Sequence, residues 1–293
     1  MQRILLTGAS GFLGSALALN LSQAGYHLTL LLRSSSRLNR LTGRESTLEI
    51  CRFRTYDEVT DIVAKIEPDL VIHTACCYGR KGESNVELLE TNILYGLNIL
   101  QGLIATNKSA TFINTSSVLP PDVSPYALTK DQFVQWGRAL AAQSNRLRFI
   151  NVRLQHMYGP GDDPSKFSTH VLQACHRNEP ELKLTAGEQK RDFVYIDDVV
   201  NAYSTLIENC DSFKSACDVD VGTGIAPSIK QFVETVHALT GSKTKLLFGD
   251  VPYRSNESMH CQADITKMLG LGWIPKYDLI SGLKRTIDME FHK

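Results

Sequence analysis

The chain has 293 residues, enough for one large domain or for two closely joined ones. Its 31 basic and 31 acidic residues balance, so no overall positive field exists to hold nucleic acid or an anionic membrane, and we expect neither as a partner. Seven cysteines without a CxxC pair predict reduced thiols and no metal site, and no apolar run is long enough for a membrane span. We therefore expect a cytoplasmic protein.

The first half of the chain alternates between strand and helix patterns. Short apolar runs predict strands at residues 3–6, 28–32, 70–73, 111–114 and 149–153. Helical patterns lie between them at residues 12–23, 58–66, 83–103 and 125–143. This alternation predicts an α/β fold with a Rossmann-type, doubly wound parallel sheet.

The pattern loosens after residue 158. We predict short strands at 193–196 and 218–221 and helices at 170–177, 199–208, 228–239 and 280–291, with Ser228 as an N-cap. Residues 1–157, rejoined by 191–222, should form a nucleotide-binding domain. Residues 158–190 and 223–293 should form a smaller C-terminal substrate-binding region.

A glycine-rich turn, TGASGFLG, connects the first predicted strand to the first predicted helix. In such a turn the first glycine permits a tight bend, the second lets a pyrophosphate approach the backbone, and the third allows close packing of helix on strand. The exposed N–H groups and the helix dipole then bind anionic oxygen. We predict a dinucleotide site made by Thr7, Gly8, Ser10, Gly11, Phe12, Leu13 and Gly14.

The residues after the second predicted strand bear on the choice of cofactor. Enzymes that use NAD place an Asp or Glu there, which binds the ribose 2′-hydroxyl. Here the segment reads LRSSSR, without an acid, and Arg33 can pair with a 2′-phosphate. Ser34 and Arg37 can add to that contact, so we predict NADP(H); the alternative is a solvated basic loop.

A tyrosine and a lysine lie four residues apart on one face of a predicted helix, at Tyr126 and Lys130. A nearby ammonium favours the phenolate and so lowers the pKa of the tyrosine, which can then exchange a proton with a carbonyl or carbinol oxygen. Just upstream, a predicted strand ends in Asn114-Thr115-Ser116-Ser117, whose hydroxyls can bind the same oxygen. The alternative is a surface Tyr beside a surface Lys.

The combination of a TGxxGxxG turn, a Ser/Thr-rich strand end and a downstream YxxxK resembles the extended short-chain dehydrogenase/reductases of the NAD-dependent epimerase/dehydratase family. Further segments agree along nearly the whole chain. They are PDLVIHTA at 68–75, TNI at 91–93, YGPG at 158–161, RDFVYIDDV at 191–199, VGTG at 221–224 and the ADITK and LGW segments within 263–273.

The resemblance implies a role for each matching residue. Tyr126 would be the proton donor, Lys130 would bind the cofactor ribose, and Thr115 would be the catalytic hydroxyl, with Ser116 or Ser117 as alternatives. Thr74, Ala75 and Asn92 would lie beside the cofactor. The substrate contacts would be Tyr78, Gly79 and Arg80 in the loop at 76–84, together with Ser116, Arg191 and Arg254; the two arginines would clamp a diphosphate.

Two departures bear on the branch of the family. Dehydratases carry an Asp–Glu pair where this chain has Ser116 and Ser117, and epimerases that retain NAD carry an acid where it has Arg33. In its short length and in these two departures, the chain resembles the nucleotide-sugar 4-ketoreductases. The resemblance implies NADPH-dependent reduction of a nucleoside-diphosphate 4-keto-6-deoxy or 3,6-dideoxy hexose, in deoxysugar and O-antigen biosynthesis for lipopolysaccharide.

Other readings stay open: a nucleotide-sugar epimerase, a reductase of a small carbonyl compound, or a non-catalytic NADP-binding regulator. The nucleotide base, the sugar and the stereochemistry at C4 stay open too. By analogy with the family, we expect a homodimer formed through the helices predicted at 83–103 and 125–143.

Overall fold

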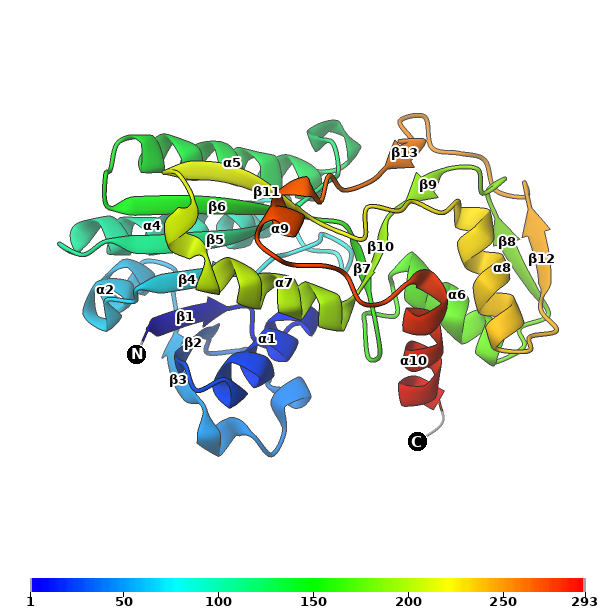
Figure 1. The fold of residues 1–293 in the computed structure, drawn as a ribbon, viewed down its shortest axis with the longest axis horizontal. Coiled ribbons are helices and arrows are strands. Elements are labelled where there is room, and N and C mark those ends of the chain that lie inside the picture. Colours follow the sequence, from blue (N-terminus) through cyan, green and yellow to red (C-terminus); the bar gives the residue numbers. More distant parts are fainter. Residues whose placement is uncertain (1, 292–293) are drawn as a thin grey trace. The chain divides into compact units, whose positions relative to one another are not determined.

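The computed structural model describes residues 2–291, and these divide into two compact units. The first unit comprises the described residues up to Arg153 together with Tyr203–Val219. It contains a seven-stranded sheet (Figure 1). The strands are β1 (Arg3–Thr7), β2 (His27–Arg33), β3 (Glu49–Phe53), β4 (Leu70–His73), β5 (Ala110–Ser117), β6 (Leu147–Leu154) and β11 (Ala216–Val221).

The strand order is β11-β6-β5-β4-β1-β2-β3, and the pairings from β5 through to β3 are parallel. The order reverses beside β1, which pairs with β2 on one side and β4 on the other. Thr7, the last residue of β1, lies opposite Leu31 and His73. In open sheets of this kind ligands bind at the carboxyl ends of the strands where the order reverses, so the end of β1 is where a site is expected.

Helices cover both faces of this sheet. Apolar side chains of α2 (Glu58–Ile66), α4 (Tyr95–Ala105) and α5 (Pro125–Ala142) form one buried core with Phe112 and Phe149 of the sheet. On the other face lie α1 (Phe12–Gln23) and the second half of α7 (Ile196–Glu208), joined by a 3.1 Å hydrogen bond from Ser204 Oγ to Asn20 Oδ1 (Figure 1). The predicted Rossmann-type α/β fold is therefore confirmed.

The second unit comprises Leu154–Ala202 and the described residues from Asp220. Its core contains Phe193 and Phe232, whose rings stack with centroids 4.2 Å apart, and Tyr158 meets both rings edge-on. Its helices are α6 (Phe167–His176), α8 (Ile229–Leu239), α9 (Thr266–Gly270) and α10 (Leu279–Phe291). Three parallel strand pairs accompany them: β7 (His156–Tyr158) with β10 (Phe193–Tyr195), β8 (Glu181–Leu184) with β12 (Lys245–Phe248), and β9 (Lys190–Arg191) with β13 (His260–Cys261).

The division differs from the predicted one at its boundaries. The sequence places 191–222 with the nucleotide-binding domain, whereas only Tyr203–Val219 joins the first unit. The reason is local pairing. β10 pairs with β7 instead of entering the large sheet, and the first turns of α7 are tied to the second unit because Asp198 accepts the backbone N–H groups of Lys276 and Tyr277.

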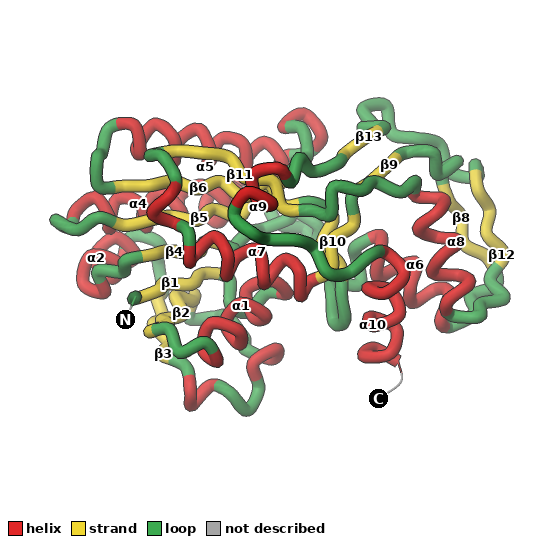
Figure 2. The backbone as a smooth tube through the Cα atoms, in the orientation of Figure 1, coloured by secondary structure: helices red, strands yellow, loops and turns green. Residues whose placement is uncertain are grey.

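Several element boundaries also differ from the sequence prediction (Figure 2). The helix predicted at 83–103 consists of α3 (Asn85–Leu89), a π-helical turn at Glu90–Leu94, and α4. β3 was not predicted, because its sequence EICRF mixes charged and apolar residues at the edge of the sheet. Ser228 does cap α8, through a capping box with Gln231. Short 3₁₀ turns complete the described chain at Asn39–Leu41, Glu45–Thr47, Pro121–Val123 and Cys210–Ser212.

Candidate active site

The glycine-rich turn joins β1 to α1 and has the geometry that pyrophosphate binding requires. Gly8 has a φ of +72°, and the Gly11 N–H donates to the Gly8 carbonyl at 2.8 Å. A Cβ atom at Gly14 would lie 2.1 Å from Gly8 O, and one at Gly8 would lie 2.6 Å from Ala75 N. Because backbone occupies both spaces, only glycine allows the helix to start this close to the strands.

The mouth of this turn fits an anionic group. Gly11 is the N-cap of α1, and within the described chain no side chain caps this helix end. A Cβ atom at Gly11 would meet only Gly8 O within 4 Å, so the outer side of the turn is open to a ligand. Uncapped N–H groups at a helix N-terminus bind phosphate oxygen. The turn at Ser10, Gly11 and Phe12, where binding was predicted, therefore has a geometry that fits a pyrophosphate.

Other predicted cofactor residues support the turn from within. Thr7 is buried, and its hydroxyl lies 2.9 Å from His73 Nδ1. The Thr74 hydroxyl donates to Thr7 O at 2.7 Å, and the Ala75 N–H donates to the Thr7 hydroxyl at 3.4 Å. These bonds tie the ends of β1 and β4 together, and Leu13 is buried below them. Their side chains therefore hold the turn in shape.

The basic loop after β2 is held by an arginine that the sequence analysis missed. Arg33, Ser34 and Arg37 are exposed, as contact with a ribose phosphate requires. Arg52 of β3 donates from Nη1 to the carbonyls of Arg33, Ser34 and Ser36 at 3.2, 3.4 and 3.1 Å. Arg52 therefore holds the backbone of a loop that exposes Arg33 and Arg37, and exposed guanidinium groups of this kind fit a 2′-phosphate.

The tyrosine and lysine lie in the first turns of α5. Ser124 caps this helix by accepting the Ala127 N–H, and Pro125 occupies the first turn. Tyr126 is partly buried and Lys130 is 2% exposed. Burial raises the pKa of Tyr126 and lowers that of Lys130. The pair therefore occupies the water-poor setting in which a proton can be passed to a bound oxygen.

Asn92, at the centre of the π-helical turn, connects two parts of this site. It is 1% exposed, accepts the Cys77 N–H at 2.7 Å, and donates to Cys77 O and to Thr129 Oγ1, both at 2.9 Å. Thr129 in turn donates to the carbonyl of Tyr126 at 2.9 Å. Asn92 thus fixes the loop after β4 against the helix turn that carries Tyr126 and Lys130.

The candidate hydroxyls at the end of β5 point to different faces of the sheet. Alternation along the strand puts Thr115 on the face covered by α7 and Ser116 on the face covered by α5. Thr115 Oγ1 lies 2.5 Å from Oη of Tyr203, a fully buried residue of α7 that the sequence analysis missed. Ser116 is 8% exposed. Thr115 therefore already has a hydrogen-bonding partner that fixes its side chain.

The loop after β4 brings two of its predicted residues to the tyrosine. The Tyr78 ring lies against that of Tyr126, with centroids 4.8 Å apart and planes at 36°. The guanidinium of Arg80 lies 5.2 Å from the centroid of the Tyr78 ring. Gly79, between them, has a φ of +68°. The positive charge of Arg80 lowers the pKa of Tyr126.

The two predicted diphosphate arginines belong to one cluster within the second unit. Arg191, in β9, donates from Nη2 to Glu257 Oε1 at 2.5 Å, and these side chains are only 11% and 20% exposed. The Glu257 N–H donates to the carbonyl of Arg254 at 3.1 Å. One turn therefore joins both arginines. Glu257, which the sequence analysis missed, is the carboxylate that pairs with Arg191.

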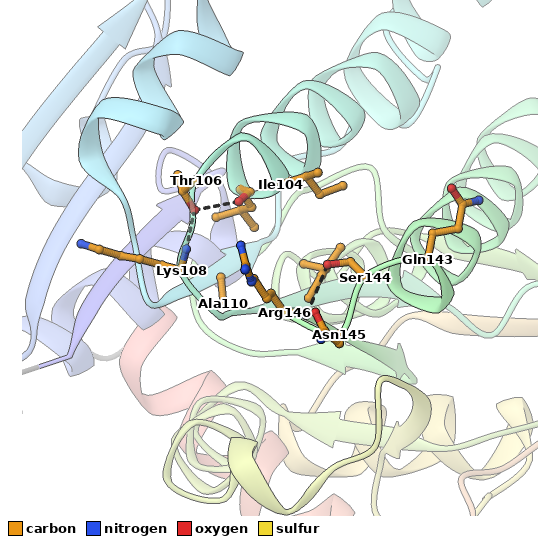
Figure 3. Close-up of a pocket in the computed structure, with 10 residues that line it drawn as sticks. Ile104, Thr106, Lys108, Ala110, Gln143, Ser144, Asn145 and Arg146 are labelled. Atoms are coloured by element: carbon orange, nitrogen blue, oxygen red, sulfur yellow. Dashed lines mark hydrogen bonds between the residues drawn. The ribbon is translucent and has the colours of Figure 1, made fainter.

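A separate cavity of about 160 Å³ lies at the amino ends of the strands, away from these residues (Figure 3). Lys108 and Arg146 line it, where β5 and β6 begin. Lys108 is already paired with Glu67, and Arg146 is bonded to Asn107 at 3.1 Å. No described residue with a predicted catalytic role borders this cavity. The candidate active site therefore remains at the carboxyl ends of the strands.

Two further properties concern the described residues. None of their helices is both long and apolar enough to cross a bilayer. Among the same residues, no three His, Cys, Asp or Glu side chains gather as ligands for a metal ion.

A Rossmann sheet, a glycine-rich turn that fits a pyrophosphate and a Tyr–Lys pair on α5 are features of a nucleotide-dependent enzyme. The chain belongs to the NAD dependent epimerase/dehydratase family, whose model matches residues 4–222. CDP-abequose synthase of Salmonella typhimurium is 30% identical over 298 residues, which cover 98% of this chain and 97% of that protein. The resemblance predicted from the motifs is confirmed, and the chain is a nucleotide-sugar-modifying enzyme of this family.

Solved structures agree on the fold. UDP-glucose 4-epimerase from Thermotoga maritima, solved with UDP-glucose, is similar with a TM-score of 0.83 at 24% identity, over 98% of each chain. UDP-glucose 4-epimerase from Thermus thermophilus, in complex with NAD, is similar with a TM-score of 0.81 at 22% identity, over 98% of each chain.

Proposed function

We propose that this protein reduces the 4-keto group of a nucleoside-diphosphate 4-keto-6-deoxy or 3,6-dideoxy hexose with NADPH. The observation that carries the proposal is the Tyr126–Lys130 pair on α5, beside a strand end at which Ser116 and Ser117 stand in place of an acid–base pair. A site with one proton donor and no such pair suits a single hydride addition, because eliminating water requires a further acid and base.

The residues proposed to hold NADPH are those of the glycine-rich turn and the basic loop after β2. NADPH, when bound, supplies the hydride. Arg33 and Arg37 are proposed to bind the 2′-phosphate, with Arg52 bracing their loop, and no carboxylate directly follows β2 in the sequence to accept a free 2′-hydroxyl. Although a structural neighbour binds NAD, this loop supports NADP(H) as the cofactor here.

Tyr126 is proposed to donate its phenolic proton to the sugar oxygen at C4 as that oxygen becomes an alkoxide. The O–H bond of the phenol breaks, the O–H bond of the product forms, and the phenolate regains its proton from solvent. Thr115, or else Ser116 on the sheet face that α5 covers, is proposed to donate a hydrogen bond to the same oxygen and so stabilise its developing charge. Lys130 is proposed to bind the ribose hydroxyls of the cofactor through its buried ammonium.

The proposed substrate carries a diphosphate and a deoxygenated sugar. Arg191 and Arg254 are proposed to bind the diphosphate, with Arg191 exchanging Glu257 for phosphate oxygens. The 30% identity to a CDP-abequose synthase supports a CDP-sugar, and with it a place in deoxysugar and O-antigen biosynthesis in the cytoplasm. Tyr78, Gly79, Arg80 and Ser116 are proposed to line the sugar pocket.

A nucleotide-sugar 4-epimerase is the second candidate, because two solved neighbours carry that name. Such an enzyme removes and returns the hydride, so its cofactor is regenerated in each cycle. A reductase consumes one NADPH for each sugar reduced. The stoichiometry of NADPH consumption therefore separates the two activities.

We also propose a homodimer that associates through α4 and α5. These neighbouring helices and the π-helical turn expose large apolar side chains that a monomer would leave in water. The side chains are Leu94, Ile104, Leu128 and Trp136, between 38% and 52% exposed.

The test is NADPH oxidation, followed by absorbance, with CDP-, dTDP-, GDP- and UDP-4-keto-6-deoxysugars. We expect turnover with NADPH to exceed that with NADH, one NADPH oxidised per sugar, and a CDP-sugar among the substrates.

Tyr126→Phe should lower kcat by roughly 10³-fold or more while NADPH still binds, since the ring is kept and only the proton donor is lost. Tyr26→Phe, which removes a phenol just before the amino end of β2, at the other end of that strand from Arg33, should leave kcat unchanged. Near-normal turnover by Tyr126→Phe would refute the proposed role, and sugar conversion without net NADPH loss would identify an epimerase.

A further inference from the structure

Three side chains form a chain of contacts that ends on the proposed proton donor. The ring of Tyr126 lies against the ring of Tyr78, and the guanidinium of Arg80 lies over the ring of Tyr78. A 4.8 Å centroid separation with tilted planes is a favourable aromatic contact, and a cation 5.2 Å from a ring centroid is attracted by its negative face. Each contact therefore restrains the next residue in the series.

The loop that supplies Tyr78 and Arg80 is fastened at both ends. At its start, the side chain of Asn92 binds both the N–H and the carbonyl of Cys77. At its end, Ser84 caps α3 through a capping box with Glu87. Between these points, the Lys81 N–H donates to Glu83 Oε2 at 2.6 Å. A loop anchored in this way presents its side chains in one arrangement instead of many.

Among the charges around Tyr126, that of Arg80 favours the ionised form of the phenol. Burial raises the pKa of Tyr126, and the Cys76 thiol raises it further, whereas the positive charge of Arg80 lowers it. Lys130 is four residues away on the same helix and is itself deeply buried, which lowers its own pKa. The carboxyl groups on the loop and on the elements packed against this helix end are those of Glu83, Glu87, Glu90 and Asp122.

We propose that Tyr78 and Arg80 are positioning residues for Tyr126: the Tyr78 ring fixes the plane of the Tyr126 ring, and the Arg80 guanidinium holds a positive charge over the Tyr78 ring that packs against it. This inference rests on the proposed role of Tyr126 as proton donor. When the phenol gives up its proton, Arg80 stabilises the phenolate that is left. Arg80 thus acts on the proton transfer through Tyr126, in addition to any contact with the sugar.

The test compares Arg80→Gln, Arg80→Lys and Tyr78→Leu with the wild-type enzyme, using the nucleotide sugar that the wild type reduces. Loss of the charge in Arg80→Gln should lower kcat by roughly tenfold, the size of a one-unit pKa change in the donor. KM should change far less. The alkaline limb of the kcat profile should move to higher pH, because the phenol then holds its proton more tightly.

Arg80→Lys keeps the charge and should recover most of the lost kcat, whereas Tyr78→Leu removes the ring between the two groups and should lower kcat as Arg80→Gln does. Arg177→Gln, which removes an exposed arginine at the end of α6, is the control and should match the wild type. A rise confined to KM, or equal losses in Arg80→Gln and Arg80→Lys, would overturn the inference. If the wild type reduces no sugar, or if Tyr126→Phe remains active, the proposed function fails instead.

Discussion

At the scale of single residues, the bond between Thr115 and Tyr203 decides how the proposed catalytic hydroxyl is presented. Their oxygens lie 2.5 Å apart, and Tyr203 is fully buried, so its hydroxyl has little other choice of partner. If Tyr203 donates, the proton of Thr115 stays free for the substrate oxygen. Tyr203 is then the group that orients Thr115, as a supporting side chain does in other preorganised sites.

Tyr203→Phe tests this arrangement. Removing the phenolic hydroxyl frees the Thr115 side chain to rotate, and we expect kcat to fall roughly tenfold with little change in KM for NADPH. The same substitution in a Thr115→Ala background should cause almost no further loss, because the group it orients is gone. Steady-state kinetics on the four proteins measures this coupling. Equal losses in both backgrounds would show that Tyr203 acts otherwise, and an inactive Ser116→Ala beside an active Thr115→Ala would make Ser116 the catalytic hydroxyl.

The same residues show what the sequence can and cannot reveal. The glycine turn, Tyr126 and Lys130 could be found because each motif carries its chemistry within a few neighbouring positions. Arg52, Tyr203 and Glu257 could not, because each acts on a segment distant in the chain and no local pattern marks it. The only sequence signal for Glu257 is its closeness to Arg254.

At the scale of elements, patterns of burial predicted most helices and central strands. The helices at 12–23 and 58–66 and the strand at 70–73 match the structure to the residue, because apolar periodicity and breaking residues define both of their ends. The edge strand β3 and the π-helical turn were missed. An edge strand needs few apolar residues. The π-helical turn around Asn92 depends on tertiary hydrogen bonds that the local sequence does not show.

Strand β7 carries a histidine that should make the protein sensitive to acid. His156 packs against Phe193, its buried Nδ1 has no hydrogen-bond partner in the described structure, and burial, helped by Arg191 and Lys166, lowers its pKa from 6.5 to about 4. As the pH falls through 6.5, the unfolded chain gains this proton before the folded protein does. The stability that neutral His156 contributes is therefore fully present above pH 6.5 and is lost progressively as the pH falls to about 4.

The measurement is the free energy of unfolding in urea at about pH 7 and about pH 4.5. The difference in unfolding free energy between the two pH values should be roughly 2 kcal/mol smaller in His156→Gln than in the wild type, because glutamine keeps a polar side chain but cannot take up the proton. His260→Gln, at an exposed site in β13, is the matched control and should leave that difference unchanged. An unaltered difference in His156→Gln would show that His156 does not titrate as inferred.

At the scale of the whole molecule, the open question is how the exposed apolar side chains of α4 and α5 are covered. Leu128 and Trp136 are eight residues apart on α5, so they lie on one helix face two turns from each other, and they are 44% and 52% exposed. Isolated apolar side chains on a surface are ordinary, but a row of them along adjacent helices supports the proposed dimer interface. In a symmetric dimer each copy would cover the same row on the other.

Trp136→Glu places a charge in the middle of this row and should convert the dimer to a monomer, because a desolvated carboxylate without a partner opposes association. Sedimentation velocity over a range of protein concentrations measures the change. Ile225→Glu, at an apolar side chain that is 70% exposed and lies outside these helices, adds the same charge and should leave the dimer intact. Each monomer should keep its own sheet and Tyr126–Lys130 pair, since all seven strands and α5 belong to one chain. A wild-type protein that sediments as a monomer at every concentration would exclude the dimer. Dissociation by Ile225→Glu instead of Trp136→Glu would show that the interface lies elsewhere.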